Sequence, residues 1–216
     1  KITIPYVYQA KLSGIGINAP HKVVWYRKKL DLPEAMYGKE IILHFGAVDY
    51  SCKLWVNDVF ITEHMGGHIS FEADITHALK EKENTIVLEV TDEPADLEIP
   101  RGKQYWKEQS EGIFYTRSTG IWQSVWIEAV DKTHLAKVFF TPDLDNMQLE
   151  VQYELSSGKA TSLRSEIYYE DKLIAANTTD SLRKEGSYKV FLDKQLLNNW
   201  NFQEDMAWTP ENPRLF

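Results

Sequence analysis

Short stretches in which apolar and polar residues alternate recur along the whole chain. A period of two places successive side chains on opposite faces of a β-strand, so each stretch predicts one strand. In the first part of the chain the predicted strands cover residues 22–32, 40–45, 49–56, 59–64, 69–73 and 85–90. A second series covers residues 135–141, 147–155, 163–169, 173–178 and 187–192. The pattern predicts an all-β chain.

The segment from Gly112 to Val130 is the most aromatic of these stretches. Its second half alternates, with one predicted face made of Ile121, Gln123, Val125 and Ile127 and the other of Trp122, Ser124, Trp126 and Glu128. Because aromatic and β-branched residues favour buried strands, we expect this strand to be covered on both faces, in the middle of a sandwich. Thr119-Gly120 permits a sharp bend before it.

Local signals predict how several strands are joined. Asn57-Asp58 separates two alternating runs and is typical of a two-residue hairpin turn, since both residues tolerate positive φ. Asp74 is placed to cap a single helical turn over residues 76–78. Residues 92–111 show no periodicity, and an irregular connection of this length in a compact domain is expected to be functional or disordered.

The aromatic density falls near residues 131–133, and we place a domain boundary there, with one domain at 1–131 and another at 132–216. In the second domain, short strands at near-regular spacing, one pair joined by Asp171-Lys172, are typical of an immunoglobulin-like sandwich. The chain has one cysteine, which excludes an intrachain disulfide. That residue, Cys52, alternates with Leu54 and is expected to be a small buried apolar residue.

Composition and charge restrict the partners. With 43% hydrophobic and 12% aromatic residues, the 216-residue chain can bury a core. A net charge of −8 argues against nucleic acid, and Arg27-Lys28-Lys29 is interpreted as a solvated strand edge. No apolar run approaches ~18 residues, so no membrane partner is expected. The compartment stays open: a cytoplasmic protein is slightly favoured over a periplasmic or secreted one whose N-terminal signal was removed.

Three motifs occur in one order along the chain. They are the run RSTGIWQSVWIE over residues 117–128, the run VWYR over residues 24–27 followed by Leu32-Pro33, and the run from Leu43 to Thr76. In sequence, order and separation they resemble the N-terminal sugar-binding domain of glycoside hydrolase family 2, which holds β-galactosidases, β-glucuronidases and β-mannosidases. The resemblance covers nearly the whole chain.

The resemblance implies a jelly-roll, galactose-binding-like β-sandwich followed by an immunoglobulin-like β-sandwich. The run from Trp208 to Pro213 resembles the turn before the last strand of the family's second domain, so that strand is expected to be truncated. The implied function is the non-catalytic N-terminal fragment of a retaining, β-galactosidase-like glycoside hydrolase that cleaves O-glycosidic bonds. A (β/α)8 catalytic domain would follow, and the full enzyme could be a homo-oligomer. The alternative is a stand-alone carbohydrate-binding module without hydrolytic activity.

No residue of this chain is expected to be catalytic. Retaining hydrolysis uses two carboxyl groups about 5 Å apart, which the family places on barrel strands. Glu108 and Glu111 lie on a predicted loop that would not fix such a distance, and we interpret them as solvated acids. Hydrolysis of a β-glycoside by this chain alone is therefore not expected.

The resemblance implies that a loop of the first domain shapes the sugar subsite at the barrel mouth, and the matching loop is residues 99–106. Arg101, Lys103 and Gln104 offer hydrogen-bond donors for hydroxyls or a carboxylate. Tyr105 and Trp106 offer flat apolar faces for a pyranose ring. An ordinary surface loop whose aromatic residues pack on the barrel is the other interpretation.

Two positions depart from the family pattern. Phe114 stands six residues before Gly120, where the large β-galactosidases and the β-glucuronidases have a sugar-contacting Asp. Lys1 stands where some β-galactosidases have Asn. The sugar therefore cannot be transferred from either subgroup. His64 and His68 flank Met65-Gly66-Gly67, but a zinc site needs about four ligands, so we expect no metal and no cofactor.

Overall fold

The structure is a computed structural model, and it describes residues 1–158, 160, 162–180, 183–192 and 207–216. The described chain is built from strands and three single turns of 3-10 helix. It divides into two compact units, Lys1–Val130 and Asp131–Phe216. The all-β class predicted from the alternation is confirmed.

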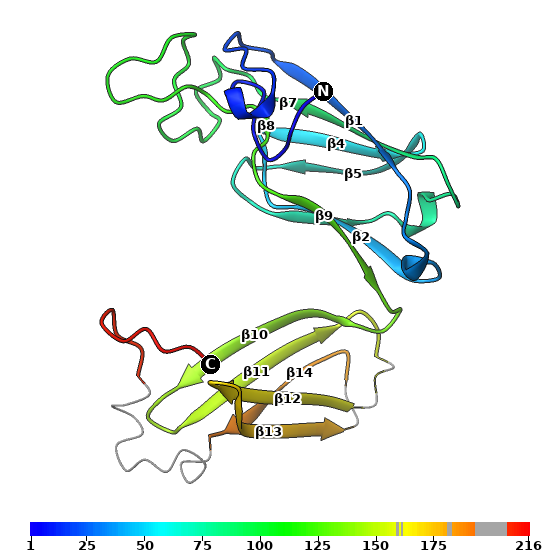
Figure 1. The fold of residues 1–216 in the computed structure, drawn as a ribbon, viewed down its shortest axis with the longest axis vertical. Helices are drawn as coiled ribbons and strands as arrows, with labels where there is room; N and C mark the ends of the chain where they lie inside the picture. The colour runs from blue at the N-terminus through cyan, green and yellow to red at the C-terminus, as the bar shows by residue number, and fades with distance from the viewer. Residues whose placement is uncertain (159, 161, 181–182, 193–206) are drawn as a thin grey trace. The chain divides into compact units, whose positions relative to one another are not determined.

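The first unit contains two main layers (Figure 1). One sheet has the order β1-β7-β4-β5, and its strands are Val23–Leu30, Asn84–Thr91, Ser51–Val56 and Val59–Met65. The other has the order β6-β2-β9, with strands Phe71–Asp74, Glu40–Phe45 and Val125–Val130. The short strands β3 and β8, Val48–Asp49 and Gly120–Ile121, form a separate hydrogen-bonded pair. The remaining elements are the single turns η1 (Lys11–Ser13), η2 (Glu34–Met36) and η3 (Thr76–Ala78).

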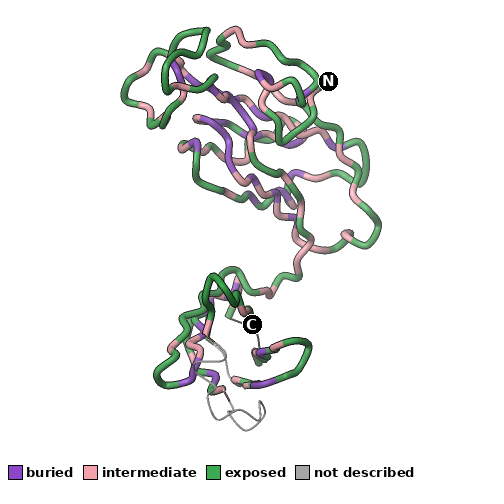
Figure 2. The backbone as a smooth tube through the Cα atoms, turned by 60° about the vertical axis from the view of Figure 1, so that its left-hand side comes forward, coloured by how far each residue is buried: buried purple, intermediate pink, exposed green. Residues whose placement is uncertain are grey.

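The core of this unit follows directly from the alternation. In β2 and β4 every second residue is buried, and the intervening ones are more exposed. The core gathers Ile41, Leu43, Phe45, Leu54, Val56, Leu88 and Val90 from both layers. Figure 2 shows the buried positions concentrated along the strands of this unit. The strands predicted for the first part of the chain are confirmed, with ends that match or shift by one or two residues. The predicted strand over residues 49–56 is interrupted at Tyr50, between β3 and β4.

The hairpin between β4 and β5 is the predicted one. Asn57 and Asp58 have φ values of 50° and 66°, which are the left-handed conformations that a two-residue turn requires. The Asn57 amide also donates to the carbonyl of Ala78 at 2.8 Å and to Oδ1 of Asn84 at 2.7 Å. Asn84 is fully buried, so these bonds attach the turn to the neighbouring strand end.

The predicted helical turn at residues 76–78 is also present, as η3. Oδ1 of Asp74 accepts hydrogen bonds from the Thr76 amide at 2.9 Å and from the Thr76 hydroxyl at 2.6 Å. The hydroxyl of Thr76 in turn accepts from the Ile41 amide at 2.8 Å. The turn is thereby linked to the start of β2.

The prediction for residues 112–130 was wrong in two respects. The segment forms two strands, β8 and β9, separated at Trp122–Ser124. Strand β9 lies at the edge of its sheet, and only one of its faces is covered: Val125 and Ile127 pack on the core, and the opposite face is open. Trp126 is 49% exposed, and its ring stacks on the imidazole of His44 in β2 at 4.9 Å. The ring of Trp126 is thus covered by the imidazole of His44 on the same sheet. The aromatic content had predicted that a second layer of structure would cover it.

The second unit contains the three-stranded sheet β10-β11-β14 and the hairpin β12-β13. The strands are Leu135–Asp143, Gln148–Leu155, Ser162–Tyr169, Lys172–Asp180 and Glu185–Phe191. They match the predicted series, but the hairpin turn lies one residue earlier, at Glu170-Asp171, whose φ values are 47° and 62°. Val151, Ile174 and Val190 form the centre of its core.

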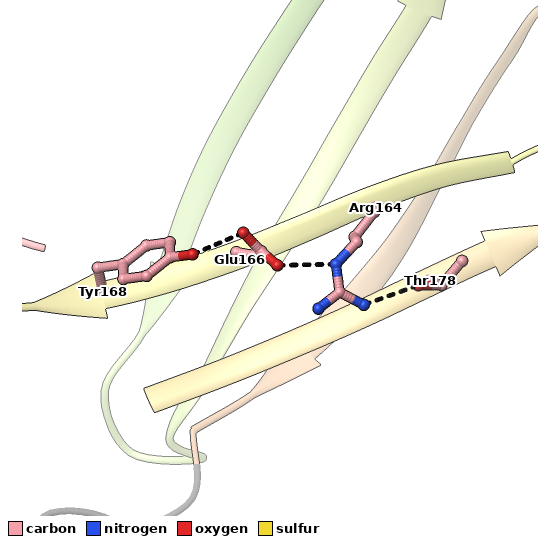
Figure 3. A network of polar contacts seen from close by, with 4 residues as sticks. All are labelled: Arg164, Glu166, Tyr168 and Thr178. Carbon is pink, nitrogen blue, oxygen red and sulfur yellow. Dashed lines mark hydrogen bonds and ion pairs between the residues drawn. The ribbon is translucent and has the colours of Figure 1, made fainter. Parts of the chain in front are cut away.

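A polar network covers one face of the β12-β13 hairpin (Figure 3). The Glu166 carboxylate accepts from Nε of Arg164 and from the hydroxyl of Tyr168, both at 2.7 Å. Arg164 also reaches the hydroxyl of Thr178 on the other strand at 3.5 Å. The hydrogen bond from Tyr168, followed by that from Arg164, lowers the pKa of Glu166. This polar face is suited to contact with water, in contrast to the apolar face that packs on the core.

Three smaller predictions concern Cys52, the tail and the membrane. Cys52 is buried as expected, and burial raises the pKa of its thiol to about 12.

Thr209 and Asn212 exchange backbone hydrogen bonds of 3.1 Å, which makes a tight turn in the tail. None of the helices in the described part of the chain has the length and apolar character needed to cross a lipid bilayer.

Candidate functional site

The candidate site is the loop that joins β7 to β8, residues 92–119, which we call the 92–119 loop. It has no strand in it, as the missing periodicity predicted. Its two halves are nevertheless held together, because the Tyr105 amide donates to the carbonyl of Tyr115 and the Tyr115 amide to that of Lys103, both at 2.8 Å. The predicted site residues 101–106 therefore lie beside residues 113–117.

Two buried carboxylates form the floor beneath the loop. Asp49, at the end of β3, is 3% exposed, and Asp92, directly after β7, is 8% exposed. Oδ2 of Asp49 accepts from the Gln104 amide at 2.7 Å, and Oε1 of Gln104 accepts from the Ser118 amide at 2.6 Å. Oδ2 of Asp92 accepts from the hydroxyl of Thr119. The middle and the end of the loop are thereby fastened to strand ends of the sandwich.

Two arginines lie against this floor. Arg117 is 5% exposed and donates from Nη1 to the carbonyl of Trp106 at 3.2 Å, while Nη1 of Arg101 donates to the carbonyl of Pro94. Nη2 of both arginines, and Nε of Arg117, have no hydrogen-bond partner among the described residues. Together with Asp49 and Asp92 they line a small cavity. The cavity therefore contains charges of both signs and unused donors.

Burial raises the pKa of Asp49 and of Asp92, because each carboxylate loses water when the chain folds. Hydrogen bonds partly oppose this effect, from Gln104 to Asp49 and from Thr119 to Asp92. The positive charges of Arg101 and Arg117 act on Asp92 in the same opposing direction. Desolvation is the largest cause for both groups, so the net direction is upward.

This direction predicts an unusual pH dependence. A carboxyl with a raised folded pKa holds its proton more tightly in the native state, so its contribution to stability falls as pH rises above its unfolded value of 3.8. We expect the stability of the wild type, relative to that of Asp49→Asn, to decrease from about pH 4 towards neutrality. Urea unfolding of both proteins at several pH values measures this difference. A difference that rises with pH, as for an ordinary ion-paired carboxylate, would contradict the assignment.

Aromatic rings form the upper part of the loop. The Tyr105 ring stacks on Phe114 at 5.1 Å and meets Trp106 edge-on at 4.6 Å, and it is 6% exposed. The Tyr105 hydroxyl donates to Oε2 of Glu111 at 2.9 Å. Trp106 remains 44% exposed. Phe114, which replaces the acidic residue of the family pattern, therefore supports the two rings from the other half of the loop.

The predicted site residues fall into two groups. Lys103 and Trp106 lie on the outside of the loop, and Arg101 is half-buried at the cavity. Gln104 and Tyr105 point inward, and their polar atoms form hydrogen bonds with Asp49, Ser118 and Glu111. A free amide at Gln104 and a free ring face at Tyr105, as the sequence predicted, are not found. Their bonds make them supports of the loop.

Reasoning from sequence missed Asp49, Asp92 and Arg117. The signal for the two acids was their position next to predicted strands, where a buried carboxylate can meet a connecting loop. Arg117 was visible as the first residue of the motif over residues 117–128, but its burial was not predicted. The ring of Tyr115, 66% exposed, was also missed.

The histidines considered for a metal site make other contacts. His64 stacks on Phe71 at 4.2 Å, and its Nε2 lies 3.3 Å from the carbonyl of Gly66. His68 meets the ring of Trp122 edge-on at 5.6 Å. Within the described ranges, no group of three or more His, Cys, Asp or Glu side chains is arranged to hold a metal ion.

The first unit also has a larger hollow, a groove of about 980 Å3 between the edge strands β1 and β9. Its lining is mainly apolar and includes Ile15, Ile17, Tyr26, Val125 and Ile127. Polar side chains such as Tyr8, His21 and Arg27 also border the groove, but most of its exposed lining surface is apolar, whereas a sugar needs several hydrogen-bonding partners for its hydroxyls. The 92–119 loop is therefore the better candidate for a polar ligand.

Comparison with known proteins gives one family. The family model of glycosyl hydrolases family 2, sugar binding domain, matches residues 4–128. A β-galactosidase from Thermoanaerobacter pseudethanolicus is 26% identical over 204 residues, covering 90% of this chain and 25% of that protein. The dog (Canis lupus familiaris) β-glucuronidase is 25% identical over 175 residues, covering 72% of this chain and 27% of that protein.

Solved structures agree on the fold. A β-glucuronidase from Bifidobacterium dentium, complexed with coumarin-3-O-glucuronide, has a TM-score of 0.69 at 18% identity and covers 89% of this chain and 37% of that one. A glycosyl hydrolase family 2 member from Bacteroides cellulosilyticus has a TM-score of 0.65 at 23% identity and covers 89% of this chain and 25% of that one. The chain spans about a quarter of the length of the curated relatives it matches. By its motifs, its β-sandwich fold and the family match over residues 4–128, the chain belongs to glycosyl hydrolase family 2 and carries that family's sugar-binding domain.

Proposed function

We propose that this chain is the non-catalytic N-terminal part of a retaining, β-galactosidase-like glycoside hydrolase that cleaves O-glycosidic bonds. In this proposal the first unit is the jelly-roll sugar-binding domain, and the second is an immunoglobulin-like spacer. A (β/α)8 barrel of the same polypeptide supplies the two catalytic carboxyl groups. Family membership and the coverage of about a quarter of each curated relative support this division of labour.

One observation carries the role of the first unit. The 92–119 loop is tied to the sandwich by buried polar bonds from Gln104 and Thr119, although it has no regular structure. A loop held in this way presents its outer side chains in fixed positions, which is what a binding site requires. The proposal is that this loop forms one wall of the sugar site.

The side chains then take different roles. Trp106 supplies an apolar face for the C–H groups of a pyranose ring, and Lys103 supplies a charged donor for a hydroxyl or a carboxylate. Arg101, half-buried where the loop meets the sandwich, is the third proposed contact. Gln104 and Tyr105 complete the set as positioning residues, because their polar atoms are used inside the loop.

The test is Trp106→Ala in the polypeptide that contains both this chain and a catalytic barrel. We expect kcat/KM for a β-galactoside to fall. The fall should correspond to a loss of about 1–3 kcal/mol of transition-state stabilisation, the scale of one lost stacking face or charged hydrogen bond. Leu97→Ala is the matched control, since Leu97 is an apolar residue of the same loop and 84% exposed. It is expected to leave kcat/KM unchanged.

A second test of the proposed function uses the isolated 216-residue chain. We expect it to show no turnover of nitrophenyl β-glycosides, because it contributes no catalytic carboxyl pair. Turnover by this chain, purified and compared with a mock preparation, would contradict the division of labour. Wild-type kcat/KM in Trp106→Ala would contradict the role of the loop. An open reading frame without a barrel would favour the stand-alone carbohydrate-binding module.

A further inference from the structure

Arg117 is a charged residue in the interior of the first unit. It is 5% exposed, and its Nε and Nη2 atoms are shielded from solvent. Arginine keeps its charge at any pH at which proteins are folded, and burying a charge is costly unless its partners compensate. A buried ionic group adds little to stability compared with apolar residues of similar size, and its best-attested use is to fix one geometry. The partners of Arg117 therefore indicate what this residue does.

Arg117 forms its hydrogen bond with the main chain of Trp106. Its Nη1 donates to the Trp106 carbonyl at 3.2 Å, between residues that are 11 positions apart in the sequence. The main-chain bonds that join the two halves of the loop end one residue earlier, where the Tyr105 amide donates to the carbonyl of Tyr115. After Trp106, residues 107–113 are all exposed. Arg117 thus holds the last residue before the exposed end of the 92–119 loop.

The other contacts of Trp106 are made by its ring. The indole meets the rings of Tyr105 and Phe114 edge-on, at 4.6 and 5.3 Å, and the residue remains 44% exposed. In the part of the chain that the structure describes, the bond from Arg117 is the one hydrogen bond of Trp106. Because the peptide unit is planar, a bond that holds its carbonyl restricts ψ of Trp106. It thereby restricts the direction in which the ring is presented.

The buried carboxylate of Asp92 offers another explanation of Arg117. Burial raises the pKa of Asp92, and the positive charge of Arg117 opposes this effect, so Arg117 would then serve only to offset the carboxylate. The hydrogen bond from Thr119 and the charge of Arg101 already oppose it, each more strongly than the charge of Arg117. Asp92 therefore has stronger partners than Arg117, whereas the Trp106 carbonyl depends on Arg117 for its bond.

We propose that Arg117 is a positioning residue of the sugar site, which acts through Trp106 and does not touch the sugar. Its buried guanidinium has almost no surface to offer a ligand, whereas the ring of Trp106 has. A planar guanidinium donates to the carbonyl in one fixed direction while the rest of the group stays in the interior near Asp92. This inference rests on the proposed function, because it assigns the support of the ring that this function uses.

Fluorine NMR of the 216-residue chain labelled with fluorotryptophan tests the positioning without enzymatic activity. The chain has seven tryptophans, and the resonance that disappears in Trp106→Ala belongs to Trp106. Arg117→Lys keeps the charge but loses the planar group. We expect it to shift or broaden the Trp106 resonance and to leave that of Trp126, assigned in the same way, unchanged. Arg27→Lys is the matched control, because Arg27 is an exposed arginine of β1, and it should leave the Trp106 resonance unchanged.

A double-mutant cycle in the polypeptide that contains both this chain and a catalytic barrel tests the effect on the sugar. We expect Arg117→Lys to raise KM for a β-galactoside about threefold to tenfold with kcat unchanged, since a stacking contact stabilises the bound substrate and the transition state alike. A partial loss of folded enzyme would instead lower kcat and leave KM unchanged. In the Trp106→Ala background, Arg117→Lys should change KM by less than about twofold, because the residue that it positions is absent.

Three outcomes would overturn the proposal: an unchanged Trp106 resonance in Arg117→Lys, an equal rise in KM in both backgrounds, or a fall in kcat alone. If Arg117→Lys does not fold, Arg117→Gln is the second variant, since it keeps an NH2 donor on a shorter, neutral side chain. Failure of both variants to fold would make Arg117 a residue of the fold and contradict its positioning role. Wild-type kcat/KM in Trp106→Ala would contradict the proposed function, and the fluorine resonance would still decide whether Arg117 positions the ring.

Discussion

Replacing Gly120 by alanine is expected to lower the free energy of unfolding of the first unit by about 3 kcal/mol or more. Gly120 has φ of +94°, a conformation that L residues rarely adopt. A Cβ there would overlap the hydroxyl oxygen of Tyr26 and lie 3.0 Å from its Cζ. Tyr26 cannot withdraw easily, because its ring packs against the core and its hydroxyl accepts from the Ile121 amide at 3.3 Å.

Gly112→Ala is the matched control, since Gly112 also has positive φ, +61°, but a Cβ added there would meet no other atom within 4 Å. Its expected cost is about 1 kcal/mol, that of the backbone conformation alone. Adding Tyr26→Phe to Gly120→Ala removes the closest clashing atom and should recover part of the loss. Urea unfolding followed by tryptophan fluorescence compares the wild type with these three variants. Equal costs for the two alanine variants would contradict the close approach to Tyr26.

Gln104→Ala is expected to release the 92–119 loop. Its amide joins Asp49 below to the Ser118 amide on the other half of the loop, at 2.7 and 2.6 Å. Without it, the buried Asp49 carboxylate loses the hydrogen bond that this amide donates, which costs about 2–3 kcal/mol. We expect tryptic cleavage after Arg101 and Lys103 to become about 30- to 100-fold faster, since local opening limits proteolysis.

Gln123→Ala controls for the change of residue type, because Gln123 is exposed and lies outside the loop. It should leave the cleavage rate unchanged. If the cleavage rate of Gln104→Ala matched that of the wild type, the loop would be held by its other contacts, such as the bond from Thr119 to Asp92.

These two predictions concern one arrangement. Gly120 starts β8 and lets the chain turn from the loop back into the sandwich against Tyr26. Gln104 fixes the middle of the loop on Asp49 at the end of β3. Because β3 and β8 are paired, both contacts attach the loop to the same part of the fold. The proposed sugar wall is therefore as rigid as the strand pair beneath it.

Several elements were predictable because their causes are local. Alternation with a period of two is decided by the strand itself, so the strands over residues 40–45 and 85–90 were found nearly at their true limits. The turn at Asn57-Asp58 and the hydrogen bonds from Thr76 to Asp74 at the start of η3 depend on side chains within a few residues. The motif over residues 117–128 identified the family because its residues are adjacent in the sequence.

The places where prediction failed depend on distant partners. Trp126 was expected to be buried, but it lies on the face of β9 away from the core, and this orientation depends on how the two sheets pack. That Gln104 and Tyr105 contact Asp49 and Phe114 was not predicted, because no local pattern connects these positions; their contact with a ligand stays a prediction. Trp25, Trp55 and Phe60 belong to separate predicted strands, and only strand pairing brings their rings together.

The sequence by itself determined the all-β class, the positions of most strands and turns, and membership of glycosyl hydrolase family 2. Those properties follow from side-chain periodicity, backbone preference and contiguous motifs, which act over a few residues. The tertiary structure alone decided which side of the 92–119 loop is open, which carboxylates hold it, and which aromatic rings share one surface. These depend on strand order and register, which arise only when segments far apart in the chain compete to bury their apolar faces together.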